Sequence, residues 1–187
     1  MSVHQGPVSY HLLNESGLSN SIRRTWVDYD AWLTALMYAV LFGTHDRSAI
    51  EKRLDKAVED FGDLFAQFYG KDIGNGVRSV LTRFYNGIGD LTVAYKDNDQ
   101  DSILEKRQAL YDIADEFSLM YSNINRYWDR TAIQWNMYQM INDIETEIML
   151  LSRKNFAQSI PVHDALMNHA YELADKMTEG IVQQLQF

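Results

Sequence analysis

Five histidines and the carboxylates around them are the residues of this chain whose types could support chemistry. Helical bundles hold di-iron and di-manganese centres with a Glu three positions before a His on each of two helices, joined by Glu residues from two others. None of the histidines has a Glu at that position, and the spacing occurs only in reverse, from His169 to Glu172. One reversed match is weak evidence for a metal site. The five are His4, His11, His45, His163 and His169.

Glu147 and His169 form the one pair whose position adds to this evidence. Both fall on or beside apolar stripes of two expected helices, and an antiparallel hairpin around residues 155–159 would bring them to nearly the same height. A buried Glu–His hydrogen bond is the favoured interpretation, because buried polar groups need partners. A metal site is the alternative, but two ligands are too few for a closed zinc or iron site.

Other catalytic chemistries find no support in the sequence. The chain has no cysteine, which excludes a thiolate nucleophile, a disulfide framework and Cys-ligated zinc. Residues 70–76 are rich in glycine, but no strand precedes them and no Gly-Lys-Ser/Thr follows. No Gly-x-Ser-x-Gly occurs, and the methionines fit core packing better than copper binding. We therefore expect no enzyme, no cofactor, and no catalytic, cofactor-binding or metal-binding residue.

Charge and hydropathy limit the classes of partner that the chain could bind. The 26 acidic residues outnumber the 17 basic ones, and the net charge of −9 repels phosphate backbones. The basic residues form no cationic face for anionic lipids, and the longest apolar stretch, residues 31–42, is shorter than the roughly 20 residues that cross a bilayer. We expect no nucleic acid and no membrane as partner. The lack of a signal-peptide pattern and of cysteine favours a cytoplasmic protein.

Apolar residues recur at steps of three and four along most of the chain, which predicts helices. Six are expected. The first begins near Ser21, the next four follow Thr44 or Asp46, Asp72, Asp99 and Asp129, and the last has Pro161 in its first turn. Short turns between long helices indicate antiparallel neighbours. The predicted fold is an all-α, single-domain, antiparallel up-and-down bundle of about six long helices, compatible with ferritin-like packing. Residues 1–20 are expected to be irregular or poorly ordered, and residues 21–187 to form the bundle.

Several short strings, taken in order, resemble an uncharacterised all-helical, ferritin-like-bundle family of spore-forming bacteria over about residues 26–187. Some members carry an acetylglutamate kinase label, although this chain lacks the α/β pattern and the phosphate loop of a kinase. The strings are Trp26-x-x-Tyr29-x-x-Trp32, Arg53-Leu54, Asp60-Phe61, Phe68-Tyr69-Gly70, Leu81-Thr82, Ala94-Tyr95-Lys96, Ala114-Asp115-Glu116, Asn125-Arg126-Tyr127-Trp128, Ala174-Asp175 and Gly180-Ile181.

The departures from the family pattern bear on function. The resemblance implies a His at the positions of Tyr29, Phe84 and Met140 and a Glu at that of Met167, which together form an inward-facing ligand set. Among the acidic ligands that the resemblance implies, only Glu147 survives here. Replacing imidazole and carboxylate by apolar or phenolic groups removes metal ligands. The hypothesis is that this chain fills a ligand site with apolar packing.

Three functions remain open at this stage. The first is a non-catalytic helical bundle with a partner-binding or assembly role, in which a homodimer would bury exposed aromatic residues. The second is a ferritin-like metal-binding protein using Glu147 and His169. The third is a carrier of a small apolar ligand between the helices, suggested by the methionine and aromatic content.

Overall fold

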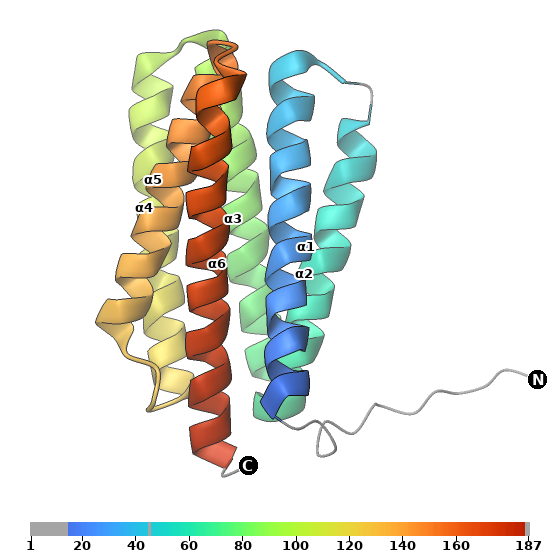
Figure 1. The fold of residues 1–187 in the computed structure, drawn as a ribbon, viewed down its shortest axis with the longest axis vertical. Coiled ribbons are helices and arrows are strands. Elements are labelled where there is room, and N and C mark those ends of the chain that lie inside the picture. The colour runs from blue at the N-terminus through green and yellow to red at the C-terminus, as the bar shows by residue number, and fades with distance from the viewer. Residues whose placement is uncertain (1–14, 45, 186–187) are drawn as a thin grey trace, which may run out of the picture.

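The computed structural model describes residues 15–44 and 46–185, which form helices and no strand (Figure 1). The predicted all-α helical bundle is confirmed. None of the helices in this part of the chain is both long and apolar enough to cross a membrane. The six helices are α1 (Glu15–Phe42), α2 (Arg47–Tyr69), α3 (Lys71–Asp97), α4 (Gln100–Ile124), α5 (Arg130–Ser152) and α6 (Phe156–Leu185).

The helices run up and down in chain order, and their packing follows a simple rule. Helices α1, α3 and α5 contact one another, and each even-numbered helix packs against two of them. Helix α2 lies against α1 and α3, α4 against α3 and α5, and α6 against α5 and α1. Short connections enforce this arrangement, because they leave room only for antiparallel neighbours. Helix α6 therefore carries its side chains to the interface of α1 and α5.

Local sequence signals account for several helix ends. Asp99 and Asp129 cap α4 and α5, with their carboxylates accepting hydrogen bonds from the backbone N–H groups of Ser102 and Ala132. Gly70 separates α2 from α3 with a φ of 88°, a conformation that glycine adopts readily. The glycine-rich segment is thus a turn followed by the first helical residues of α3.

Three expected helix starts are wrong. Helix α3 begins at Lys71 after Gly70, so Asp72 lies in its first turn and does not cap it. Helix α1 begins at Glu15 rather than near Ser21, because Leu18 and Ile22 continue its apolar stripe and are fully buried. Residues 15–20, expected to be irregular, are therefore helical, while residues 1–14 lie outside the described part. Helix α6 begins at Phe156, which places Pro161 inside the helix rather than in its first turn. The fixed φ of proline suits a helix, but Pro161 cannot donate to the carbonyl of Ala157, and its ring crowds that carbonyl.

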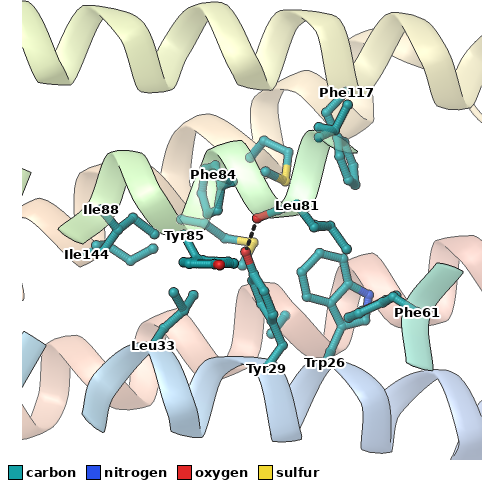
Figure 2. Packing of buried hydrophobic residues seen from close by; sticks show 14 of the residues in the cluster. Trp26, Tyr29, Leu33, Phe61, Leu81, Phe84, Tyr85, Ile88, Phe117 and Ile144 are labelled. Atoms are coloured by element: carbon teal, nitrogen blue, oxygen red, sulfur yellow. Dashed lines mark hydrogen bonds between the residues drawn. The ribbon is translucent and has the colours of Figure 1, made fainter. Parts of the chain in front are cut away.

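Aromatic residues fill the core near the middle of α1 (Figure 2). Trp26 packs edge-on against Phe61 of α2, with ring centroids 4.8 Å apart, and its ring also meets Phe117 of α4. Tyr29 points from α1 toward α3, where its hydroxyl donates a 2.8 Å hydrogen bond to the backbone carbonyl of Leu81. Such edge-to-face ring pairs add to the stability from apolar burial.

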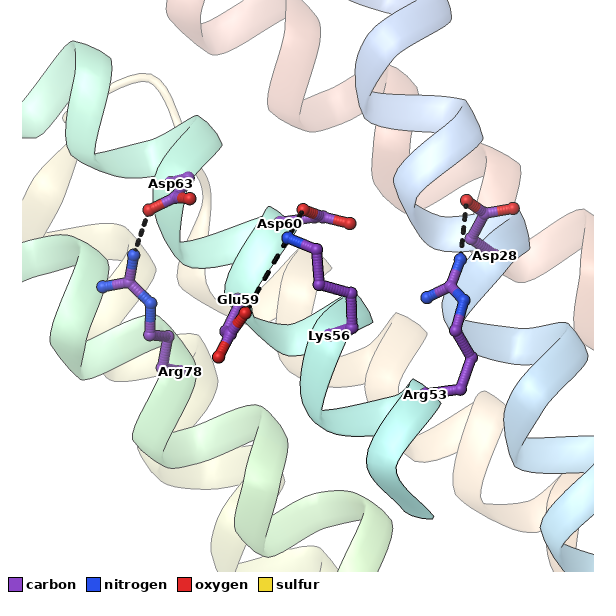
Figure 3. Close-up of polar contacts among 7 residues, drawn as sticks. All are labelled: Asp28, Arg53, Lys56, Glu59, Asp60, Asp63 and Arg78. Carbon is purple, nitrogen blue, oxygen red and sulfur yellow. Dashed lines mark hydrogen bonds and ion pairs between the residues drawn. The ribbon is translucent and has the colours of Figure 1, made fainter. Parts of the chain in front are cut away.

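Charged residues of α2 lie on its outer side and join it to both neighbours (Figure 3). Arg53 reaches Asp28 of α1 at 3.5 Å, and Arg78 of α3 pairs with Asp63. Lys56 pairs within α2 with Asp60. These ion pairs are largely exposed, so each contributes at most about 1 kcal/mol to stability.

Candidate functional site

Two buried carboxylates and an imidazole meet where α1, α5 and α6 pack together. Asp30 of α1 and Glu147 of α5 are each 3% exposed, and His163 of α6 is partly buried between them. The Nδ1 atom of His163 lies 3.4 Å from Oε2 of Glu147, and its Nε2 atom lies 3.8 Å from Oδ2 of Asp30. We call these three residues the buried acid cluster.

Helix geometry explains why the three side chains converge. Asp30 follows Trp26 by four positions and precedes Leu33 by three, so it lies on the buried stripe of α1. Glu147 precedes the buried Ile148 and follows Ile144 by three positions on α5. Because α6 packs against both α1 and α5, His163 reaches both carboxylates.

The packing of the cluster shifts the pKa values of Asp30 and His163. Burial raises the pKa of Asp30 to about 6, while the imidazole of His163 lowers this pKa and the carboxylate of Glu147 raises it. The hydrogen bond with Glu147 is the largest influence on His163 and raises its pKa, with the charge of Asp30 adding to the effect. The cluster therefore contains a carboxyl group with a pKa of about 6 and an imidazole whose pKa is raised. Holding and sharing a proton is the chemistry that this arrangement supports.

Metal binding fits this geometry poorly. A metal ion requires lone pairs that converge on one point. The two ring nitrogens of His163 face different carboxylates, so the imidazole separates Asp30 from Glu147. Within residues 15–44 and 46–185, no group of three or more histidine, cysteine or acidic side chains is arranged to hold an ion.

The expected pairing of Glu147 with His169 is wrong, because Glu147 faces His163 instead. His169 lies opposite Asp143, with its Nε2 atom 3.4 Å from Oδ2. Since α6 begins at Phe156 rather than near Pro161, the register of the α5–α6 hairpin differs from the expected one. Glu147 thus contacts a histidine, as the favoured interpretation predicted, but the histidine is His163 and not His169.

Sequence reasoning missed Asp30, although a signal was present. The buried stripe of α1 steps from Trp26 to Asp30 to Leu33, which places a carboxylate among apolar residues. A lone acid on such a stripe predicts a buried partner, since an unpaired buried charge is costly. That partner is supplied by α6, far away in the sequence.

The positions implied by the family resemblance are mostly inside the bundle. Tyr29, Phe84 and Met140 are each at most 3% exposed, and Met167 is partly buried. Burial raises the pKa of Tyr29 well above its usual value, so its hydroxyl stays protonated as it donates to α3. These side chains pack the interior and leave Glu147 to its contact with His163.

A group of exposed apolar residues lies at one end of the bundle, over α1 and α6. The rings of Tyr38 and Phe42 are 5.5 Å apart, and those of Phe42 and Phe156 are 5.9 Å apart. Ile160 follows Phe156 by one turn of α6 and is 62% exposed. We call these four residues the aromatic end patch. It is separate from the buried acid cluster.

Comparison of the chain with family models, with curated proteins and with solved structures finds no match. Function is therefore inferred from the geometry of the described residues, which form a packed apolar interior, the buried acid cluster and the aromatic end patch.

Proposed function

We propose that this protein is a non-catalytic helical bundle that assembles as a homodimer through the aromatic end patch. The observation that carries the proposal is the continuity of the patch. Tyr38, Phe42 and Phe156 are between 38% and 46% exposed. The ring of Phe42 on α1 contacts both that of Tyr38 on α1 and that of Phe156 on α6. Contiguous exposed apolar surface of this kind marks interaction sites, whereas scattered exposed apolar residues are ordinary.

The chemistry of the patch suits an interface. Aromatic residues are enriched in the buried centre of protein interfaces, and charged residues are depleted there. Truncating central aromatic anchors commonly costs most of the binding free energy. Phe42 touches aromatic neighbours on both of its sides, so it is the expected anchor.

The ferritin-like metal protein is the less favoured function. It relied on Glu147 and His169, and these residues contact different partners. Membership of the family of spore-forming bacteria, ferritin-like packing and a cytoplasmic location stay predictions. On the same resemblance, we propose that Tyr29, Phe84 and Met140 fill the interior where relatives would place metal ligands.

Sedimentation equilibrium tests the assembly. We expect the wild-type chain to be a dimer, and Phe42→Ser or Ile160→Glu to raise the dimer dissociation constant at least tenfold, which is about 1.4 kcal/mol. Both residues are exposed, so the variants should keep their helical circular dichroism.

Leu104→Glu is the matched control. Leu104 is 59% exposed, similar to Ile160, but lies on α4 outside the patch. This variant should dimerise like the wild type. A wild-type chain that stays monomeric at high micromolar concentration would overturn the proposal, as would equal losses in the control and the patch variants.

A further inference from the structure

A cavity of about 550 Å³ lies where the last turns of α1, α3 and α5 come together. Its volume is in the range of small-molecule sites. Residues from the end of each of these three helices line it, together with the beginning of α4 and the turn after α5. They are Leu41, Phe42, Tyr95, Lys96, Asn98, Gln100, Met149, Ser152, Arg153 and Lys154. We call this the basic end cavity.

The lining of the cavity divides into an apolar part and a cationic part. Leu41, Phe42 and Met149 supply apolar side chains that are partly or largely exposed. Lys96, Arg153 and Lys154 supply the charges, and no acidic side chain belongs to the lining. A site with apolar walls and a few placed charges is typical of a binding site for a small amphipathic molecule.

This excess of positive charge is unusual for such an acidic chain. Acidic residues outnumber basic ones by 26 to 17, yet the structure gives Lys96, Arg153 and Lys154 no ion pair within the part of the chain that it describes. The nearby carboxylate of Glu145 is engaged by Arg107 and by the hydroxyl of Tyr95 at 2.6 Å. The three cations of the cavity therefore have no carboxylate partner among the described residues.

Helix ends explain part of this arrangement. Cations near helix C-termini offset the partial negative charge there. Lys96 has this role, because its ammonium group donates a 2.8 Å hydrogen bond to the carbonyl of Val40 in the last turn of α1. The side chains of Arg153 and Lys154 make no hydrogen bond to the described residues, so both remain available to an anion.

We propose that the basic end cavity binds a small amphipathic carboxylate, an acid with an apolar chain. Arg153 and Lys154 hold the carboxylate group, and the chain lies against Leu41, Phe42 and Met149. The site is independent of the buried acid cluster. It shares Phe42 with the aromatic end patch, so the bound acid and the dimer partner compete for that side chain.

Isothermal titration calorimetry with octanoate at low salt tests this site. Octanol, which keeps the apolar chain, and acetate, which keeps the carboxylate, serve as comparison ligands. We expect saturable binding of octanoate with a dissociation constant of roughly 1 mM or below, and weaker binding of both octanol and acetate. The double substitution Arg153→Gln with Lys154→Gln should weaken octanoate binding at least tenfold. Both side chains are exposed, so the fold should be unaffected.

Lys52→Gln is the control, because Lys52 is an exposed lysine of α2 outside the cavity. It should bind octanoate like the wild type. Absence of saturable octanoate binding would overturn the proposal, and so would unchanged binding by the double variant. Equal affinities for octanol and octanoate would show that Arg153 and Lys154 do not contribute to binding, which would also overturn the proposal. The Ile160→Glu chain should still bind octanoate, so failure of the dimer and failure of this site are distinguishable.

Discussion

The α2–α3 pair and the α5–α6 pair place their charges on opposite sides of their interfaces. Between α2 and α3 the contact is close and mainly apolar. The ion pair of Arg78 with Asp63 lies at the outside (Figure 3), and the hydroxyl of Tyr85 donates a hydrogen bond to the exposed carboxylate of Asp55. Between α5 and α6 the charged groups are inside, where Glu147 meets His163 and Asp143 meets His169. Asp30 of α1 adds a third carboxylate to this second interface.

The difference separates a contribution to stability that does not depend on pH from one that does. An apolar interface has no group that titrates near neutral pH, so its contribution should be the same at acid and at alkaline pH. Buried carboxylates and imidazoles carry a desolvation cost that depends on their ionisation. We therefore expect α6 to be attached in a pH-dependent manner and α2 in a pH-independent one.

The largest expected effect is that of Phe61→Ala in the apolar core, where the ring attaches α2 to α1. Phe61 is fully buried against Trp26, so its removal should lower the free energy of unfolding by about 3–5 kcal/mol. The loss should be equal at pH 5 and pH 8 in urea denaturation. Leu104→Ala, at a largely exposed position, should change stability by no more than about 0.5 kcal/mol. A strongly pH-dependent loss in Phe61→Ala would remove the contrast between the interfaces.

Asp30→Asn should stabilise the protein at pH 8. The folded-state pKa of Asp30 is raised from 3.8 to about 6, so the folded state is penalised once this carboxylate ionises. Each pKa unit corresponds to about 1.4 kcal/mol, which gives a gain on the order of 2–3 kcal/mol above pH 6. The gain should decline as pH falls from 6 and be nearly absent near pH 3, below the unfolded-state pKa of 3.8, where Asp30 is protonated in both states. Unfolding free energies across this range measure it; a destabilised Asn variant at pH 8 would contradict the cost assigned to Asp30.

Two glycines of α3 test how closely the neighbouring helices approach, α2 at Gly74 and α1 at Gly89. A Cβ atom at Gly74 would lie 2.5 Å from the carbonyl oxygen of Gly62 and 2.8 Å from Cβ of Ala66. Gly74→Ala should therefore lower the melting temperature, through a loss of about 1–3 kcal/mol. At Gly89 the nearest atom is Cδ2 of Leu36 at 3.5 Å, so Gly89→Ala should be stabilising by up to about 1 kcal/mol through helix propensity. Effects of the same sign at both positions would disagree with this packing.

His163→Gln should have the smallest effect, confined to acid and neutral pH. The pKa of His163 is raised in the folded state by Glu147, so its stabilising contribution is present below pH 6.5 and is lost as pH rises through the folded-state value. We expect a loss of about 1 kcal/mol at pH 6 and a smaller one at pH 9. Chemical denaturation at the two pH values measures this. A loss that grows with pH would contradict the assigned direction.

Sequence patterns were sufficient for the fold and insufficient for the cluster. The apolar steps of three and four, the turn at residues 96–99 and the cap at Asp129 follow from local chemistry, and α2, α4 and α5 form where these signals predict them. The register of the α5–α6 hairpin depends on where α6 begins, and Pro161 was a misleading guide because proline is also accommodated inside this helix. Asp30 could be suspected from its place on a buried stripe. Its imidazole partner depends on the position of α6 between α1 and α5, which no local pattern contains.

The most direct test of the contrast between the interfaces is the pKa of Asp30 itself. Its side-chain carboxyl carbon can be followed by nuclear magnetic resonance during a pH titration of the wild-type protein and assigned by its absence from the Asp30→Asn spectrum. The account predicts a midpoint near 6, caused by burial between α1, α5 and α6. A midpoint at the ordinary value of 3.8 would show that Asp30 is solvated and that the α5–α6 side of the bundle holds no costly buried carboxylate.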